Sequence, residues 1–462
     1  MKRLEIAALL LAMTLAAGGC GKTIEQGQTE TAVETGTAEE SETAGTETID
    51  FVTAAEEAFD TTEEDGQLTI TSYHGSDTAI EIPAEIDGKT VTAIGESCFQ
   101  KAELVAVKLP DTLKQIDSGS FYMCENLKQV VLPDGVTEIG AHAFAGCEAL
   151  EQMTLPDSIT KIGAYAFNAS GLKQIQIPEG VTAIEEGTFF GCASLESVQL
   201  PEGCLRFGAD AFYNCTALQE LNFPEEPEEV GVRSLKGTPW FEEYCEAQGG
   251  GYIVFGDRLY GCGSKPEETM PEVRVIDPYA FMDNTALTDV VIPDSVEEIG
   301  AYAFGDCTSL KSVEIPDSVT QLGVELFYEC GALSSVRLPD HKDALSEGMF
   351  EACYSLREVD IPESVTSIPD GCFVMCYSLA DFTLPEGLTA IGERAFGACL
   401  DIEELYIPEY ITEIGSLAFA YDTFTTINCQ AEERPEGWAE DWFGTEEDEN
   451  TGTVNWGVEK ES

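Results

Sequence analysis

The chain has 462 residues, and 86 acidic residues against 23 Lys and Arg give it a formal net charge of −63 at pH 7. This length is enough for two or three domains. A field of this sign repels nucleic acid and anionic membrane surfaces, and the sequence contains no cluster of Lys or Arg that would form a local basic patch. We therefore expect no nucleic-acid partner, and no membrane contact except through an anchor.

Residues 1–19 predict a signal peptide for export. A basic start is followed by an apolar stretch of about 12 residues, which is shorter than the roughly 20 needed to span a bilayer. Small residues directly before Cys20 resemble a bacterial lipoprotein signal, which implies lipidation of Cys20 and attachment at the extracellular face of a bacterial membrane. Ala17 departs from the commonest form of that signal, and ordinary secretion with an incidental thiol at Cys20 is the alternative.

Residues 20–64 predict a disordered acidic tether rich in Thr and Glu. The stretch from Thr23 to Asp50 is almost wholly Thr, Glu, Gly and Ala. Such a composition cannot bury enough apolar area to fold. Repulsion between its carboxylates would keep it extended and hold the rest of the protein away from the membrane.

From Leu68 onward the sequence is a repeat. A Pro follows a strand-like Leu, Ile or Phe at a period that is nearly always 23 residues, at Pro83, Pro110, Pro133, Pro156, Pro178, Pro201, Pro224, Pro293, Pro316, Pro339, Pro362, Pro385 and Pro408. A period of this size predicts a stacked architecture. A single unit buries too few side chains to fold alone, so stacked units must share one continuous core.

Each repeat reads as two extended pieces and a return segment. In one unit Val313 and Ile315 alternate onto one face of a short strand, and Pro316 ends it because Pro cannot donate to the next ladder bond. A turn and a second short extended piece follow. The apolar residues of the next segment, such as those of 299–310, recur at spacings close to a helical face, which predicts a single helical turn.

The pattern LxxVxIPxxVTxIGxxAFxxCxxL resembles the BspA-type leucine-rich repeat of bacterial surface proteins, and it covers about Leu68 to Cys429. The resemblance implies a repeat solenoid, a leucine-rich-repeat-like right-handed superhelix of mainly short parallel β-strands with single helical turns. The predicted parts are an N-terminal cap with the first repeat at 65–99, repeats at 100–236, a helix–hairpin interruption at 237–270, repeats at 271–429, and a C-terminal cap at 430–462.

The interruption contains its own local signals. Thr238 is placed as a helix N-cap with Pro239 at the first helical position. The pair Gly256-Asp257 predicts a hairpin turn between Tyr252–Phe255 and Arg258–Tyr260. The four Trp lie outside the regular repeats, where a solenoid needs bulky residues to cover its core.

Nine of the 16 Cys stand 14 residues after the repeat Pro, at Cys124, Cys147, Cys192, Cys215, Cys307, Cys330, Cys353, Cys376 and Cys399. Cys98 and Cys372 occupy a position where other repeats have Ala, so Cys replaces a small buried residue there. We predict a ladder of buried thiols. Disulfides between repeats are the alternative in an exported chain. Metal binding is not expected, because no CxxC pair is present.

Acidic residues follow twelve of the thirteen repeat Pro, and the three His lie far apart in the sequence. A line of single carboxylates does not supply the six to eight oxygens of a Ca²⁺ site, so we expect solvated turn residues. No nucleophile, base or phosphate loop is recognisable. We therefore predict no catalytic residue, no cofactor, no metal and no enzyme activity.

The candidate binding residues occupy the strand position between the two inward residues. This position changes charge and size from repeat to repeat, at Lys108, Thr154, Gln176, Gln199, Asn222, Glu314, Arg337, Asp360, Thr383 and Tyr406. A recognition strip would vary in this way, and so would a solvated face without function. We predict a monomeric, lipid-anchored surface protein that binds an extracellular protein or glycan in adhesion. The alternatives are an envelope-associated structural scaffold, and an enzyme with its site in the interruption or the tail.

Overall fold

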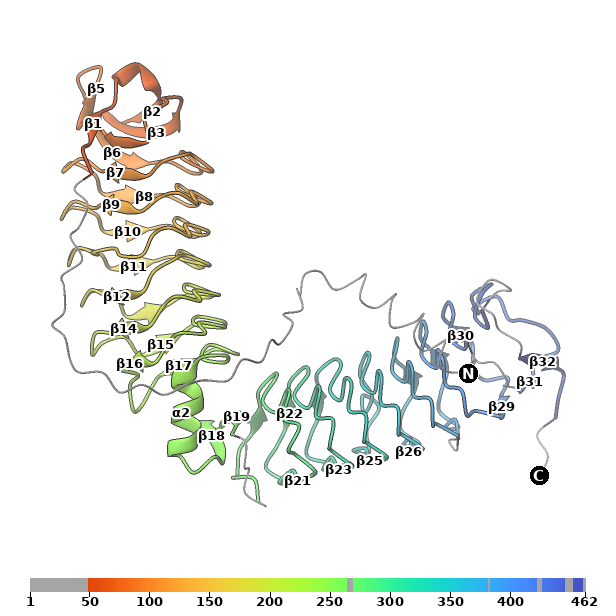
Figure 1. The fold of residues 1–462 in the computed structure, drawn as a ribbon. Helices are drawn as coiled ribbons and strands as arrows, with labels where there is room; N and C mark the ends of the chain where they lie inside the picture. The colour runs from red at the N-terminus through yellow and green to blue at the C-terminus, as the bar shows by residue number, and fades with distance from the viewer. Residues whose placement is uncertain (1–48, 264–268, 381–382, 422–425, 445–451, 460–462) are drawn as a thin grey trace, which may run out of the picture. The chain divides into compact units, whose positions relative to one another are not determined.

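The structure is a computed structural model that describes residues 49–263, 269–380, 383–421, 426–444 and 452–459. In this part the chain is a β-solenoid of about 16 turns with parallel strands and little helix. Figure 1 shows the turns stacked as successive rungs. The predicted solenoid of short parallel strands is therefore confirmed.

The LxxVxIP segments form the first ladder of parallel strands. Neighbouring strands pair in the repeat register, for example Val107 with Val130 and Val313 with Val336. Its strands form four sheets in the orders β1-β4-β7-β9, β12-β14-β16, β21-β23-β25-β26 and β29-β31-β32. Their bounds are β1 (Val52–Thr53), β4 (Ala79–Glu81), β7 (Ala106–Lys108), β9 (Gln129–Val131), β12 (Gln174–Gln176), β14 (Ser197–Gln199), β16 (Glu220–Leu221), β21 (Asp289–Val291), β23 (Ser312–Glu314), β25 (Ser335–Arg337), β26 (Glu358–Asp360), β29 (Glu404–Ile407), β31 (Thr426–Cys429) and β32 (Thr453–Trp456).

The VTxIG segments form the second ladder. These strands are mostly two residues long, and the residue that follows, most often Gly, begins the next turn. They are β6 (Lys89–Ile94), β8 (Gln115–Ile116), β10 (Glu138–Ile139), β11 (Lys161–Ile162), β13 (Ala183–Ile184), β15 (Arg206–Phe207), β17 (Glu229–Val230), β20 (Val275–Ile276), β22 (Glu298–Ile299), β24 (Gln321–Leu322), β27 (Ser367–Ile368), β28 (Ala390–Ile391) and β30 (Glu413–Ile414).

The return segment is not the single helical turn that its spacing predicts. In one rung the N–H groups of Ala145 and Cys147 donate to the carbonyls three residues before them, while those of His142, Phe144 and Gly146 donate to the next rung. Alternate residues thus serve a chain of β-turns and a third ladder between rungs. His142 has φ 55° and Gly146 has φ 71°, which a right-handed helix excludes.

The core is built from stacked Phe rings. Eleven neighbouring pairs of the return-segment Phe, such as Phe121 with Phe144 and Phe304 with Phe327, have ring centroids 4.8–5.7 Å apart and nearly parallel planes. One apolar cluster runs from Ala54 to Leu235 and a second from Leu259 to Trp442. The interruption divides the two.

The ends and the interruption differ from the rungs. Residues 52–64, assigned above to the disordered tether, contain β1, a 3₁₀ turn (Glu56–Ala58) and β2 (Phe59–Glu64), which pairs antiparallel with β3 (Gln67–Tyr73). That boundary was therefore wrong, while residues 1–48 lie outside the described residues. A short strand β5 (Glu85–Ile86) pairs with β6. At the other end the buried rings of Trp438 and Trp442 pack against the last rung.

The interruption has the predicted helix and hairpin. Helix α2 (Pro239–Ala247) begins at Pro239, and the hydroxyl of Thr238 accepts a hydrogen bond from the Phe241 N–H. Strands β18 (Tyr252–Phe255) and β19 (Arg258–Cys262) pair antiparallel, and β19 also pairs with β20 of the second ladder.

Candidate functional site

The ten candidate binding residues all lie on the outward side of the first ladder; we call them the strand-side row. Seven lie in strands β7, β12, β14, β23, β25, β26 and β29. Thr154 and Asn222 occupy the same place in rungs whose strand is absent or shorter there, and Thr383 occupies it directly after two residues that the structure does not describe. The described members are exposed, apart from half-buried Lys108 and Tyr406. Cys20, the predicted lipidation site, lies outside the described residues.

Parallel register brings some members of the row side by side. Gln176 pairs with Gln199, and Arg337 lies between Glu314 and Asp360. The row is not one continuous ladder, because the first ladder is divided into four sheets. It therefore presents separate groups of neighbouring side chains.

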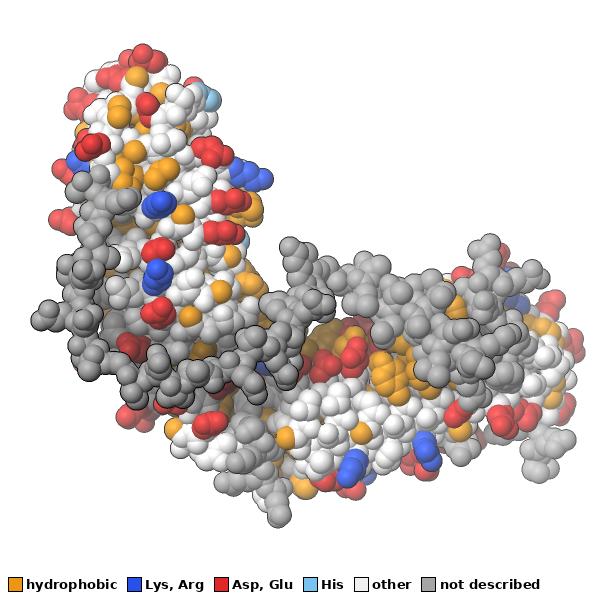
Figure 2. Space-filling model, in the orientation of Figure 1, with side chains coloured by type: hydrophobic (Ala, Val, Ile, Leu, Met, Phe, Trp, Pro, Cys, Tyr) orange, Lys and Arg blue, Asp and Glu red, His pale blue; other side chains and the backbone are white. Residues whose placement is uncertain are grey.

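Hollows of two chemical kinds lie along the row. One, of about 470 Å³, is lined by Gln152, Thr154, Gln174, Gln176, Ser197 and Gln199 over the backbone of the strands; we call it the amide hollow. The other kind comprises two hollows of about 630 and 760 Å³ around Arg337, whose lining includes Asp340, Glu358, Asp360 and Glu363; we call these the acidic hollows. The surface in Figure 2 shows Lys and Arg placed singly among the acidic side chains.

Several polar members of the row are already engaged within the protein. Lys108 Nζ donates to Glu81 at 2.8 Å, and the Asn222 amide bonds both the N–H and the carbonyl of Leu200. Arg337 donates to the Ile315 carbonyl at 3.0 Å and to Asp317 at 3.1 Å. By contrast, within the described residues no hydrogen bond engages the side-chain amide of any Gln of the amide hollow.

Reasoning from the sequence missed half of the amide hollow. Gln152, Gln174 and Ser197 stand two positions before members of the strand-side row, so they face the same side. The same alternation would have identified them, because a strand of three residues has two outward positions. In the rung at 151–155, Gln152 forms an isolated bridge with Gln174, so the two amides come from neighbouring rungs.

The turn residues after the repeat Pro are exposed, and some of them border the hollows. Among the residues that the structure describes, no group of three or more His, Cys, Asp or Glu could hold a metal ion. Each His has a structural contact: His74 with Asp60, His142 stacked on Tyr165, and His341 with the Val319 carbonyl.

All nine repeated Cys are buried, and the 15 described Cys are free thiols. The predicted thiol ladder is confirmed for them. Each of the nine donates its S–H to the Phe carbonyl of the preceding rung, at 3.0–3.3 Å. Burial raises the pKa of the Cys124 thiol to about 11, so it is protonated and unreactive at neutral pH.

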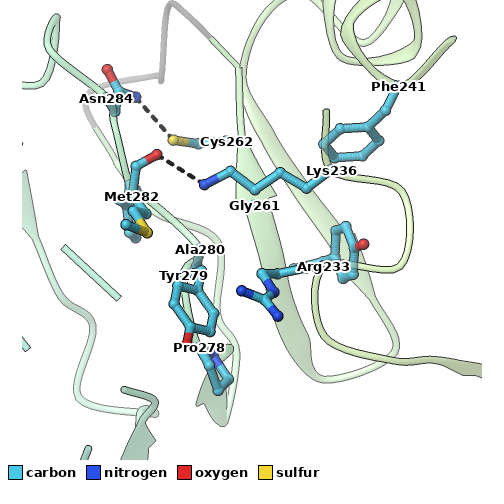
Figure 3. Close-up of a pocket in the computed structure, with 12 residues that line it drawn as sticks. Arg233, Lys236, Phe241, Gly261, Cys262, Pro278, Tyr279, Ala280, Met282 and Asn284 are labelled. Carbon is cyan, nitrogen blue, oxygen red and sulfur yellow. Dashed lines mark hydrogen bonds between the residues drawn. The ribbon is translucent and has the colours of Figure 1, made fainter. Parts of the chain in front are cut away.

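A smaller cavity, of about 70 Å³, lies where the interruption meets the rungs (Figure 3). Lys236 reaches across it to the Met282 carbonyl at 3.2 Å, and burial lowers the pKa of its ammonium group. Arg233 is bound by Asp210, and Lys236 lies 3.6 Å from Asp283. Both cations are paired with carboxylates, so they are not available to an anionic ligand. The cavity is therefore part of the contact between the interruption and the rungs.

A comparison with known families decides what kind of repeat this is. The family described as BspA type leucine rich repeat region matches residues 76–150, 115–240, 274–399 and 343–434, which is more than half of the chain. The chain belongs to the BspA-type leucine-rich repeat family. The two matched blocks flank the interruption, so the family repeat corresponds to the regular rungs.

Solved structures of leucine-rich repeat proteins resemble this family member over most of its length. A leucine-rich repeat protein from Eubacterium ventriosum is 20% identical, with 83% of this chain and 95% of that one covered and a TM-score of 0.51, which supports the fold. A leucine rich cell surface protein from Faecalibacterium prausnitzii is 26% identical (88% and 99% covered, TM-score 0.49). One from Bacteroides ovatus is 25% identical (89% and 99% covered, TM-score 0.42). The curated proteins give no match. None of the helices in the described ranges has the length and apolar character of a membrane span.

Proposed function

We propose that this BspA-type repeat protein is a cell-surface adhesion module, anchored by a lipid on Cys20, that binds an extracellular protein or glycan through its strand-side row. The fold presents repeated side chains along an extended surface, as solenoid binding proteins do. We propose no catalytic activity and no cofactor for it, and we expect the bacterial extracellular face as its location. We expect a monomer, whose rungs supply the whole binding surface.

One observation carries this proposal: the outward strand positions vary while the inward ones repeat. Val107, Val313 and Val336 occupy the same buried place in their rungs. Beside them the outward residues are Lys108, Glu314 and Arg337. A passive scaffold needs only a solvated face, whereas hollows that differ in chemistry along the row are what a ligand would distinguish.

The anchoring proposal is supported by the sequence before the solenoid. A basic start, a short apolar stretch and small residues precede Cys20. The acidic stretch that follows would separate the solenoid from an anionic membrane by charge repulsion. A surface position therefore agrees with both the signal and the charge.

The test is to measure binding of the purified protein to labelled matrix proteins and to a glycan array, and then to alter the row. Arg337→Ala with Tyr406→Ala should weaken binding of the ligand found, because Arg and Tyr are frequent anchoring residues. The matched control is Arg206→Ala, an exposed Arg on the second ladder. The ion pair of Arg337 with Asp317 is exposed, so Arg337→Ala alone should hardly change the melting temperature, and it is measured beside the double variant because Tyr406 is half-buried.

Two results would contradict the proposal. Full affinity in the double variant, with loss instead on changing Tyr252 or Trp240, would move the site to the interruption. Absence of binding to every matrix protein and glycan tested would favour the scaffold alternative.

A further inference from the structure

The amide hollow has unused hydrogen-bonding capacity. Gln152, Gln174, Gln176 and Gln199 are exposed, and each amide has one acceptor oxygen and two N–H donors. In the described structure none of these four amides bonds another protein group, unlike Lys108 or Arg337 on the same row. Thr154 adds a hydroxyl to the group. The hollow therefore offers a set of neutral donors and acceptors close together.

The hollow lies on the outward side of the strands, over their backbone. Met153, Leu155 and Ile175 are counted among its lining, but they are inward residues of the core and only 4–8% exposed, so they add little apolar surface. The groups that a ligand would meet are the outward Gln, Thr and Ser side chains. Convergent polar groups of this kind fix the orientation of a small ligand.

Charge restricts the class of ligand. Among the described residues that line the amide hollow, Asp157 alone is charged, in a protein of net charge −63. An anion would be repelled by this protein, and a cation would lose hydration without gaining a full set of charged partners. The acidic hollows supply such partners, and this hollow does not. A neutral ligand fits it best.

Geometry separates a saccharide from an extended peptide. Neighbouring strands of a sheet lie about 4.8 Å apart, and Gln176 and Gln199 project from paired places on such strands, whereas an extended peptide places like-facing residues about 6.6 Å apart. A peptide along the solenoid would therefore fall out of register within two rungs. Saccharide hydroxyls lie on adjacent carbons and each can donate and accept, so neighbouring Gln side chains can bond them in several ways.

We propose that the amide hollow binds a neutral saccharide, with its hydroxyls on the Gln side chains. This inference rests on the proposed function, since the hollow includes Thr154, Gln176 and Gln199 of the strand-side row. The described residues that line the hollow include no aromatic ring. Flexible Gln side chains must also be ordered on binding, so we expect a dissociation constant of about 1 mM.

The experiment uses the purified protein and defined probes. Binding of cellohexaose, xylohexaose, mannohexaose and maltohexaose is measured by calorimetry and by saturation-transfer NMR, with a heparin hexasaccharide and an uncharged extended peptide as comparison arms. Gln176→Ala with Gln199→Ala removes two amides from the hollow without touching the buried strand residues. Gln321→Ala removes an exposed amide from β24 on the second ladder and is the matched control.

The expected result is saturable binding of at least one neutral hexaose, weakened about tenfold or more in the double variant and unchanged by Gln321→Ala. Gln176→Glu should also weaken it, because the new carboxylate cannot donate. No binding of the four hexaoses, equal affinity in the double variant, or preference for heparin or the peptide would overturn the inference. If the Gln variants keep full binding while Arg337→Ala with Tyr406→Ala loses it, the proposed function stands and only the saccharide site fails.

Discussion

Replacing Arg233 should weaken the connection between the two repeat blocks. Arg233 lies in the last rung before the interruption, where its Nε and Nη2 donate to the two carboxylate oxygens of Asp210 at 2.8 and 2.7 Å. Its guanidinium carbon is 4.7 Å from the Tyr213 ring centroid and 4.6 Å from that of Tyr279. Tyr279 belongs to the first rung after the interruption, so one side chain joins both blocks.

The contacts set the size of the effect. Two partly buried cation–π contacts contribute about 0.5–1 kcal/mol each. The Asp210 side chain is only 13% exposed, and leaving its carboxylate without a partner costs about 1–3 kcal/mol. We expect Arg233→Ala to lower the free energy of unfolding by about 3 kcal/mol. Arg233→Lys keeps the charge but loses the paired hydrogen bonds, so its loss should be smaller.

The assay is urea unfolding followed by circular dichroism, with hydrogen exchange resolved by mass spectrometry. In a solenoid each rung is stabilised by its neighbours, so the loss should appear as faster exchange in the rungs on both sides of the interruption. Arg206→Ala, which removes an exposed Arg elsewhere, is the control. A change below about 0.5 kcal/mol, or faster exchange confined to the terminal caps, would refute this reasoning.

Three further predictions concern the thiols, the anchor and pH. Alkylation of the native protein should be slow at buried thiols such as Cys124, and denaturation without reductant should free them; mass-spectrometric detection of disulfides between rungs would contradict this. Cys20→Ala should release the protein from membranes or leave its signal uncleaved, and unchanged membrane retention would exclude lipidation there. Burial, followed by the charges of Glu329 and Asp283, raises the pKa of Asp306 from 3.8 to about 6. Stability should therefore fall by about 1 kcal/mol, after allowance for solvent screening, as pH rises from about 4 to about 7. Asp306→Asn should flatten that part of a melting-temperature profile, and a parallel profile would contradict the assignment.

The repeat made the ladders predictable and left the return segment ambiguous. A spacing of three residues between Phe144 and Cys147 suits a helix, and it also suits a β-turn closed by a bond from residue i to residue i+3. The β-turns differ from a helix in the left-handed conformation of residues such as His142. L-residues adopt it at a cost of about 1 kcal/mol, which the bonds to the next rung offset here. That compensation comes from neighbouring rungs, so one repeat read alone does not reveal it.

The N-terminal boundary could have been placed correctly. Residues 67–73 alternate polar and apolar side chains directly after Asp65-Gly66, and this dipeptide is a strong hairpin signal. In the structure both residues have positive φ, 53° and 80°, as such a turn requires. The acidic composition of the preceding stretch favoured the prediction of disorder and so concealed the hairpin. Net charge bears on solubility, and it does not indicate whether two neighbouring strands pair.

The thiol position was predicted for its size, and the structure adds a chemical requirement. Ser170 and Asn284 replace Cys there, and each can donate a hydrogen bond. Cys, Ser and Asn differ in hydrophobicity but share a donor group, and in the nine Cys rungs the donor satisfies a buried Phe carbonyl. Ala would fit the space and leave that acceptor with fewer partners.

These constraints limit how the solenoid can recognise a ligand. Where the ladders are intact, backbone donors and acceptors on all three sides are used between rungs, as Ile315 and Arg337 show on the first ladder. An extended partner therefore cannot add a strand in the middle of the stack, since strand addition needs a free edge. The inward side chains are fixed by stacking, and the return segment is fixed by its turns. The proposed recognition along the rungs therefore rests on outward side chains of the strands, and its proposed specificity on those, like the Gln of the amide hollow, that are not already bound to the protein itself.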